Sequence, residues 1–256
     1  MRTDTQDGVV TLTFDHPERL NAVTTGDLDE ASEAIERASK DDAVRVVVLA
    51  GDGRAFCSGA DIGDGTDVSG AGGESLDAAN RLVAAIVRSP KIVVAQARGV
   101  VAGVGVSIAL AADLVLLDED SYLLLAFTRI GLMPDGGATA LVAASIGRAR
   151  ALRLALLAER LPASEALAAG LVTHVWPTCD YDAEVDRVVG VLRRGPAVAY
   201  ARTKAAINDA TLDGLDSAFA REREGQVGLL GAPDFAEGTS AFRERRAPRF
   251  NDELGR

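Results

Sequence analysis

The chain has 256 residues, of which 48% are hydrophobic and 4% aromatic, so it is long enough for one α/β domain with an aliphatic core. Its formal net charge of −11 argues against nucleic-acid binding as the main function, because an acidic surface repels a phosphate backbone. Two cysteines and two histidines, all isolated along the chain, argue against a disulfide framework and provide too few ligands for a zinc site.

A membrane location is also disfavoured. The N-terminal stretch "MRTDTQDGVV" lacks the apolar core of a signal peptide. The longest run of low polarity, residues 99–112, is too short to cross a bilayer and ends at Asp113. We therefore expect a cytoplasmic protein with no metal, no membrane partner and no nucleic-acid partner.

Strands and helices are expected to alternate through the first half of the chain. Apolar or alternating runs predict strands at residues 9–14, 44–51, 92–97 and 113–117. Helical spacing predicts one helix over residues 28–38, capped by Thr24 or Thr25, and another that Ser75 caps and that stops before Pro90. This order predicts right-handed crossovers and a mostly parallel sheet.

The second half of the chain is expected to be mainly helical. Two short helices flank Pro162, a further strand is predicted at residues 171–176, and no strand is expected from Tyr181 onward. The pair Gly195–Pro196 predicts a boundary. We therefore expect a core over residues 1–195 and a helical region over residues 196–256.

One local pattern matches short-chain dehydrogenases. The glycines of "GVVAGVG" at residues 99–105 lie between a strand and a helix, and Tyr200-x-x-x-Lys204 supplies the second half of the pattern. A dinucleotide fold, however, carries its glycines in its first turn, and here about 90 residues of βα structure come first. We therefore expect Tyr200 and Lys204 to share one face of a helix without a catalytic role.

Two further patterns are weaker. The segment "GVSIA", centred on Ser107, resembles the nucleophile elbow of hydrolases and precedes Asp135 and His174 in hydrolase order, but alanine replaces its last glycine. The spacing of three loop aspartates departs from the EF-hand pattern, and no glutamate closes it. These calcium candidates are Asp61, Asp64 and Asp67. We expect a structural histidine and a solvated loop.

Six segments together resemble the enoyl-CoA hydratase/isomerase family, the crotonases. They are "HPERLNAV" (16–23), "GRAFCSGADI" (53–62), "GVVAGVGVSIALAADLVL" (99–116), "IGLMPDGGAT" (130–139), "ASEALAAGLVTHV" (163–175) and "FAEGTSAFRERRAPRF" (235–250). Their joint order is specific and covers nearly the whole chain. The resemblance implies a crotonase-like α/β fold: a spiral core of ββα turns with a C-terminal helical oligomerisation region, assembled as a homotrimer or a dimer of trimers.

The resemblance also implies an oxyanion hole for a thioester. Enolate chemistry places negative charge on the thioester oxygen, and a backbone N–H fixed in advance stabilises that charge by about 2.7–4 kcal/mol. The tight turn "SGAD" presents the N–H of Ala60. "AGVGV" starts a helix, where orphan N–H groups meet an anion, and by resemblance the second donor is the N–H of Val104. The family usually has glycine there, so the valine side chain is expected to narrow the acyl slot.

The acid–base groups differ from those of the family's hydratases. Those enzymes use two glutamates, which fall at Ser107 and about Phe127 here, so a two-carboxylate hydration is not expected. Family branches that include Δ3,Δ2-enoyl-CoA isomerases and a dehalogenase place one acid in the turn where Asp135 lies. A carboxylate in an apolar pocket has a raised pKa and is a better base. The alternative is that Asp135 only caps the helix that follows it.

Coenzyme A is expected as part of the substrate, and no separate cofactor is expected. By resemblance, Arg19 and Arg54 precede motifs that line the nucleotide, and the backbone of Ala60, Asp61 and Ile62 touches its adenine. The basic tail is expected to reach a phosphate from a neighbouring subunit. Its arginines are Arg243, Arg245, Arg246 and Arg249.

The sequence therefore favours an acyl-CoA-processing enzyme that shifts a double bond through an enolate, with Asp135 as its base. Enoyl-CoA hydratase activity is the nearest alternative. A thioester hydrolase that uses Ser107 and a non-catalytic acyl-CoA binder are alternatives of other classes.

Overall fold

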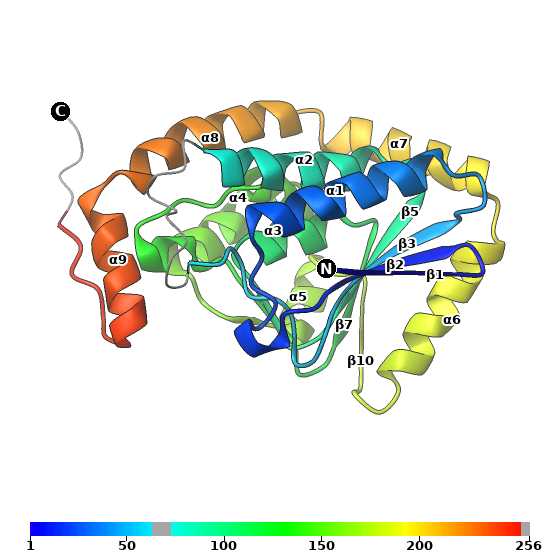
Figure 1. Ribbon diagram of the computed structural model, residues 1–256, viewed down its shortest axis with the longest axis horizontal. Coiled ribbons are helices and arrows are strands. Elements are labelled where there is room, and N and C mark those ends of the chain that lie inside the picture. Colours follow the sequence, from blue (N-terminus) through cyan, green and yellow to red (C-terminus); the bar gives the residue numbers. More distant parts are fainter. Residues whose placement is uncertain (63–72, 252–256) are drawn as a thin grey trace.

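The structure is a computed structural model that describes residues 1–62 and 73–251. Figure 1 shows helices layered over a main sheet, with the C-terminal helix at the far end of the molecule. The calcium candidates Asp64 and Asp67 lie outside the described residues. So do most of the loop 61–73, whose closure over a substrate the sequence leaves open, and residues 252–256 of the helical region.

Six strands form the main sheet, in the order β1-β2-β3-β5-β7-β10. Their bounds are β1 (Arg2–Gln6), β2 (Val9–Phe14), β3 (Val46–Gly51), β5 (Ile92–Ala97), β7 (Leu114–Asp118) and β10 (His174–Trp176). The β1–β2 pair is antiparallel and every other neighbouring pair is parallel, which confirms the mostly parallel sheet. Sequence analysis misses β1 because all five of its residues are polar and exposed.

Helices cover both faces of the main sheet. They are α1 (Thr25–Lys40) and α2 (Glu74–Arg88) on one face and α6 (Tyr181–Arg194) on the other. Side chains alternate accordingly along β3: Val47 and Leu49 join the core beneath α1 and α2, whereas Val46 and Val48 pack with α6. This two-sided burial accounts for the nearly continuous apolar runs.

The helix ends confirm one capping prediction and correct another. Thr24 caps α1, because its side chain accepts from the Asp27 N–H at 3.2 Å while the Asp27 carboxylate accepts from the Thr24 N–H at 2.9 Å. The prediction that Ser75 caps α2 is wrong. The cap residue is Gly73, whose φ of 95° is a left-handed value that favours glycine. The helix stops before Pro90, as predicted.

A second, smaller sheet has the order β4-β6-β8-β9. Its strands are β4 (Ala55–Cys57), β6 (Val100–Ala102), β8 (Tyr122–Leu124) and β9 (Leu161–Pro162). β4 follows β3, β6 follows β5 and β8 follows β7, and the helices that come next in turn are α2, α3 (Val104–Ala111) and α4 (Ala138–Leu157). This repeat confirms the spiral core of ββα turns. Strands of two or three residues are too short to give a polarity pattern.

The rest of the chain is mainly helical, as predicted. Its helices are α5 (Ala163–Ala169), α7 (Ala197–Thr211), α8 (Leu215–Leu230) and α9 (Pro233–Glu244), with the short helix η2 (Ala126–Ile130) before α4. α8 lies along α2 and α4, and α9 packs against η2. Gly195–Pro196 falls between α6 and α7, while a separate trimerisation region over 196–256 stays a prediction. Among the described residues, every helix is either too short or too polar to span a bilayer.

Candidate active site

Two glycine turns bring the start of α3 against the end of β4. Gly59 and Gly103 have φ values of 111° and 54°, which favour glycine. A Cβ on Gly59 would lie 3.3 Å from the carbonyl oxygen of Ala102 and 3.5 Å from the Cα of Gly103, so the two backbones touch. Each glycine immediately precedes a predicted oxyanion donor, Ala60 or Val104.

The fold leaves the N–H groups of Ala60 and Val104 unused. Val104 is the first residue of α3, so its N–H has no acceptor within the helix. Ala60 forms a parallel bridge with Val23. In this bridge the Val23 N–H donates to the Gly59 oxygen and the Asp61 N–H donates to the Val23 oxygen, both at 2.9 Å. The Ala60 N–H therefore points away from Val23, and within residues 1–62 and 73–251 neither donor has an acceptor.

The second glycine of "AGVGV" serves packing. A Cβ on Gly105 would lie 2.6 Å from the backbone oxygen of Cys57, so this position of α3 admits no side chain. The glycines that suggested a dinucleotide site therefore seat α3 against β4. Burial raises the pKa of the Cys57 thiol to about 12, so this cysteine is not a nucleophile at neutral pH.

Asp135 lies beside the first turns of α3. The buried Ser107 hydroxyl donates to the backbone oxygen of Asp135 at 2.7 Å. A Cβ on Gly136 would lie 3.1 Å from the Ser107 Cβ and 3.4 Å from the Val104 Cγ2. The turn that carries Asp135 is thus held against the residue with the second predicted donor.

The carboxyl group of Asp135 lies in a buried environment, since only 9% of the residue is exposed. Gln226 Nε2 donates to its Oδ2 at 2.9 Å, and no residue in the described part of the chain donates to Oδ1. Burial raises the pKa to about 7; the hydrogen bond from Gln226 opposes this rise and the charge of Glu222 adds to it. Near neutral pH this carboxyl can therefore both accept and release a proton.

Glu222, not Asp135, caps α4. Its Oε2 accepts from the Gly137 N–H at 2.7 Å and its Oε1 accepts from the Thr139 N–H at 2.9 Å and from the Thr139 hydroxyl. Burial raises the pKa of Glu222 against these hydrogen bonds. The helix's own cap residue is Gly137, which has no side chain to offer. The alternative in which Asp135 only caps the following helix is therefore wrong.

Sequence analysis misses Gln226 and Glu222, which reach the Asp135 turn from α8. Gln226 is 91 positions from Asp135, so no local motif connects them. One signal was available in the sequence: two polar residues interrupt an otherwise apolar stripe at helical spacing along α8. Such a stripe is expected to be buried, and buried polar side chains need hydrogen-bond partners. The stripe is Leu215, Phe219, Glu222, Gln226 and Leu230, all buried.

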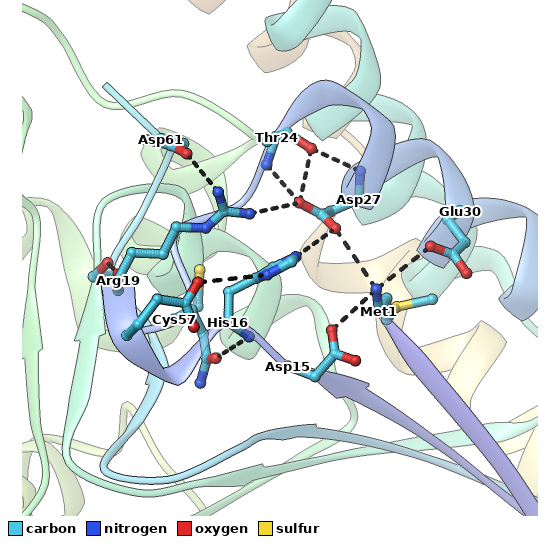
Figure 2. A network of polar contacts seen from close by, with 12 residues as sticks. Met1, Asp15, His16, Arg19, Thr24, Asp27, Glu30, Cys57 and Asp61 are labelled. Carbon is cyan, nitrogen blue, oxygen red and sulfur yellow. Dashed lines mark hydrogen bonds and ion pairs between the residues drawn. The ribbon is translucent and has the colours of Figure 1, made fainter. Parts of the chain in front are cut away.

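The residues expected around the coenzyme A nucleotide lie near the short helix η1 (Pro17–Arg19). The Arg19 guanidinium pairs with the Asp61 carboxylate at 3.0 Å and lies 3.9 Å from the Asp27 carboxylate. Figure 2 shows the Arg19 side chain between these two acids. The fold therefore brings Arg19 together with Asp61 and its neighbour Ile62.

Arg54 lies on a neighbouring turn, between β3 and β4, and its side chain is exposed. A Cβ on Gly53 would lie 3.1 Å from the first residue of η1. The buried Asn21 fixes this arrangement, since its Nδ2 donates to the backbone oxygens of Asp52 and Ala55, at 2.9 and 2.7 Å. The "HPERLN" segment thus seats Arg19 beside the turn that carries Arg54.

Part of the basic tail is neutralised within the chain. Arg246 pairs with both Glu237 and Glu244. Hydrogen bonds from the Arg246 side chain and the Arg249 backbone lower the pKa of Glu237 to about 2. Contact between the tail and a phosphate of a neighbouring subunit stays a prediction.

The dehydrogenase and hydrolase patterns do not assemble. Lys204 is buried, and its Nζ donates to Asp113 Oδ2 at 2.9 Å and to two backbone oxygens. His174 is exposed and stacks on Trp176, with ring centroids 4.8 Å apart. The Ser107 hydroxyl donates to the backbone oxygen of Asp135, so it does not pair with His174. No group of three metal-ligating side chains occurs in residues 1–62 and 73–251.

Comparisons with known proteins show which family this chain resembles along almost its whole length. A model of the enoyl-CoA hydratase/isomerase family matches residues 4–253. A probable enoyl-CoA hydratase of Rhodobacter capsulatus is 38% identical over 98% of this chain and 97% of its own. The 1,2-epoxyphenylacetyl-CoA isomerase of Escherichia coli K12 is 35% identical over 95% of each chain. A crystal structure of an enoyl-CoA hydratase from Mycobacterium avium subsp. paratuberculosis matches with a TM-score of 0.92 and 51% identity, over 98% of both chains.

Proposed function

This chain belongs to the enoyl-CoA hydratase/isomerase family, and on that premise we propose that it moves a double bond within an acyl-CoA thioester. The observation that carries the proposal is Asp135, a buried carboxyl with a pKa of about 7 beside the start of α3. Isomerisation moves one proton and adds no atom. One base and one oxyanion hole therefore suffice for it.

The N–H groups of Ala60 and Val104 would hold the thioester oxygen. They support this role because neither donor has an acceptor among the described residues and the two backbones touch. Negative charge reaches the oxygen only when a proton leaves the adjacent carbon, so donors fixed in advance stabilise the enolate more than the substrate. Each would contribute about 2.7–4 kcal/mol.

Asp135 would remove the proton from the carbon between the double bond and the thioester carbonyl. The electron pair of the broken C–H bond becomes the enolate, and the oxyanion hole holds its charge. The protonated Asp135 then returns the proton to the far carbon of the former double bond, and the thioester carbonyl is restored. The two hydratase glutamate positions give no second acid, since a serine, Ser107, and a phenylalanine, Phe127, occupy them.

We propose that coenzyme A is bound as part of the substrate, with Arg19 and Arg54 near its phosphates and the backbone at Asp61 and Ile62 near its adenine. The shared location of these residues around η1 supports this assignment. No separate cofactor is required, because the reaction is redox-neutral.

A homotrimer or a dimer of trimers remains the proposed assembly. Large apolar side chains on α4 and α7 are exposed in the single chain, which favours burial against another subunit. They are Leu156, Leu157, Val198 and Ile207. Light scattering is expected to give three or six times the 26.6 kDa chain mass, and a monomer would contradict the assembly.

The test of the reaction is product identity. Purified protein is given 3-enoyl-CoA and 2-enoyl-CoA, and double-bond migration, water addition and free thiol are followed separately. Double-bond migration without hydration is the expected result. Water addition as the faster reaction would make the protein a hydratase, thiol release would make it a hydrolase, and tight binding without turnover would make it an acyl-CoA binder.

A further inference from the structure

We propose that Gln226 of α8 is a positioning residue, which holds one oxygen of Asp135 and leaves the other for the migrating proton. This inference rests on the proposed function, because it concerns how the same carboxyl is presented. It assigns a role to a C-terminal helix that reaches the site from 91 positions away.

The Gln226 amide has a partner at each end. Its Nε2 donates to Asp135 Oδ2 at 2.9 Å, and its Oε1 accepts from the Met133 N–H at 3.0 Å. The Met133 N–H can only donate, so it requires the amide oxygen to face it, and the NH2 group must then face the carboxylate. With only 1% of the residue exposed, Gln226 cannot exchange either partner for water.

α8 is docked on both sides of Asp135. One helical turn before Gln226, Glu222 binds the N–H groups of Gly137 and Thr139, on the far side of the turn. Gly225 brings the helix close, since a Cβ there would lie 2.5 Å from the Sδ of Met133. The position of Asp135 is therefore set by α8 as well as by the Ser107 hydroxyl of α3.

Holding one oxygen matters because a carboxyl group rotates. The bond from Gln226 fixes Oδ2, and no described residue donates to Oδ1, so Oδ1 is the oxygen available to a substrate proton. A proton transfer needs heavy atoms within about 2.6–3.2 Å, so an unfixed carboxyl would spend less time in a productive geometry.

The charges around Asp135 make the role measurable. Gln226 favours the ionised carboxylate, whereas Glu222, the charged group of α8 that faces Asp135, favours the protonated acid. Within the described residues, no titratable side chain occurs in α3 or in the first two turns of α4, which also lie against the turn. Removing Gln226 and neutralising Glu222 should therefore shift the pKa of Asp135 in opposite directions.

The experiment compares Gln226→Met, Glu222→Gln and Glu224→Gln in the full-length protein. Glu224 is exposed on the same helix, so Glu224→Gln is a matched control for the loss of one negative charge. The pH dependence of kcat/KM for isomerisation and the titration of the Asp135 carboxyl carbon by NMR are measured for each. Circular dichroism confirms that each variant is folded.

Gln226→Met is expected to raise the midpoint by about one pH unit, as for the loss of a charge-assisted hydrogen bond. It should lower kcat at pH 7 by about 10-fold or more with little change in KM. Glu222→Gln should lower the midpoint, and Glu224→Gln should leave it unchanged. Equal midpoints in Gln226→Met and the parent would overturn the proposal, even if kcat falls, because a purely structural defect lowers the rate at every pH.

The two readouts separate this inference from the proposed function. The NMR titration needs no turnover, so it tests Gln226 even in a protein that does not isomerise enoyl-CoA. A parent that isomerises through Asp135, with a Gln226→Met profile that superimposes on it, would contradict the role of Gln226 alone.

Discussion

Two aspartates lie at opposite ends of α3, and the fold treats them differently. Asp113 follows the helix and is bound by the buried Lys204 ammonium at 2.9 Å and by the Val93 N–H at 2.8 Å. Asp135 lies beside the start of the same helix, and its carboxylate is bound by the neutral amide of Gln226. Desolvation raises the pKa of both carboxyls, although Asp135 is buried and Asp113 only half-buried.

The difference is the partner. A buried cation beside a carboxylate makes an ion pair that the folded state depends on. Removing either partner leaves the other charge unpaired in an apolar interior, which destabilises the fold. A buried carboxyl that faces a neutral donor and another acid keeps a raised pKa, so it can exchange a proton near neutral pH. The comparison predicts that Asp113 stabilises the fold, whereas Asp135 acts in catalysis and lowers the stability of the fold when it is ionised.

The largest expected effect is on activity. Asp135→Asn should lower kcat for isomerisation by about 100- to 10,000-fold, because it removes the only proposed base. Steady-state assays with 3-enoyl-CoA measure this, and the exposed Glu224→Gln variant is the control. An Asn variant that isomerises as fast as the parent would show that another group moves the proton.

Asp135→Asn should also be more stable than the parent protein at high pH. The folded pKa of Asp135 is about 7, above its ordinary value of 3.8. Ionisation of this carboxyl therefore destabilises the folded state as the pH rises from 3.8 to about 7, and has no effect on stability below that range. Asp135→Asn should therefore raise the free energy of unfolding by about 1–4 kcal/mol at pH 8 and leave it unchanged near pH 4. Urea titrations at the two pH values check this, and equal effects at both would contradict the raised pKa.

The Lys204 pair should show the reverse pattern. Lys204→Met leaves the half-buried Asp113 without its cation and should lower the free energy of unfolding by at most about 3–5 kcal/mol, the range for a fully buried pair. The double variant Lys204→Met/Asp113→Asn should recover part of that loss. If Lys204→Met instead removed activity at full stability, the comparison between the two aspartates would fail.

A smaller effect is expected at the contact between α3 and β4. A methyl group on Gly105 collides with the Cys57 backbone oxygen, so Gly105→Ala should lower the free energy of unfolding by about 1–3 kcal/mol. Relief of this collision should move the start of α3 and with it the N–H of Val104, so kcat should fall more than KM rises. Gly214→Ala is the control, since a Cβ at Gly214 meets open space.

The smallest effect is expected at Ser107. Ser107→Ala removes one hydrogen bond to the Asp135 backbone, so it should change the isomerisation rate by about 10-fold or less. Free thiol is measured in parallel. Thiol release that depends on Ser107 would revive the hydrolase alternative.

The sequence predicts the main sheet well because strands such as β3 and β5 are apolar on both faces and leave long runs. It does not reveal the second sheet, whose strands are too short for a pattern, or β1, which is polar throughout. The misassigned cap of α2 has a similar cause, since Gly73 caps through its backbone conformation and Ser75 only has the composition of a cap.

The candidate site is predicted in part. The family motifs locate Ala60, Val104 and Asp135 because each lies in a local turn with its own glycines. The environment of Asp135 is not predicted, since Gln226 and Glu222 approach from α8 across the fold. A motif identifies the candidate base, but only the packing of a distant helix shows what sets the pKa of this carboxyl and that it does not serve as a cap.

The most direct measurement is the pH dependence of kcat/KM for double-bond migration by the parent protein. If Asp135 is the base, the rate should fall on the acid side with an apparent pKa of about 7, because the protonated carboxyl cannot accept the substrate proton. The residual activity of Asp135→Asn should lack this limb. A limb near pH 4, or the same limb in Asp135→Asn, would contradict the account.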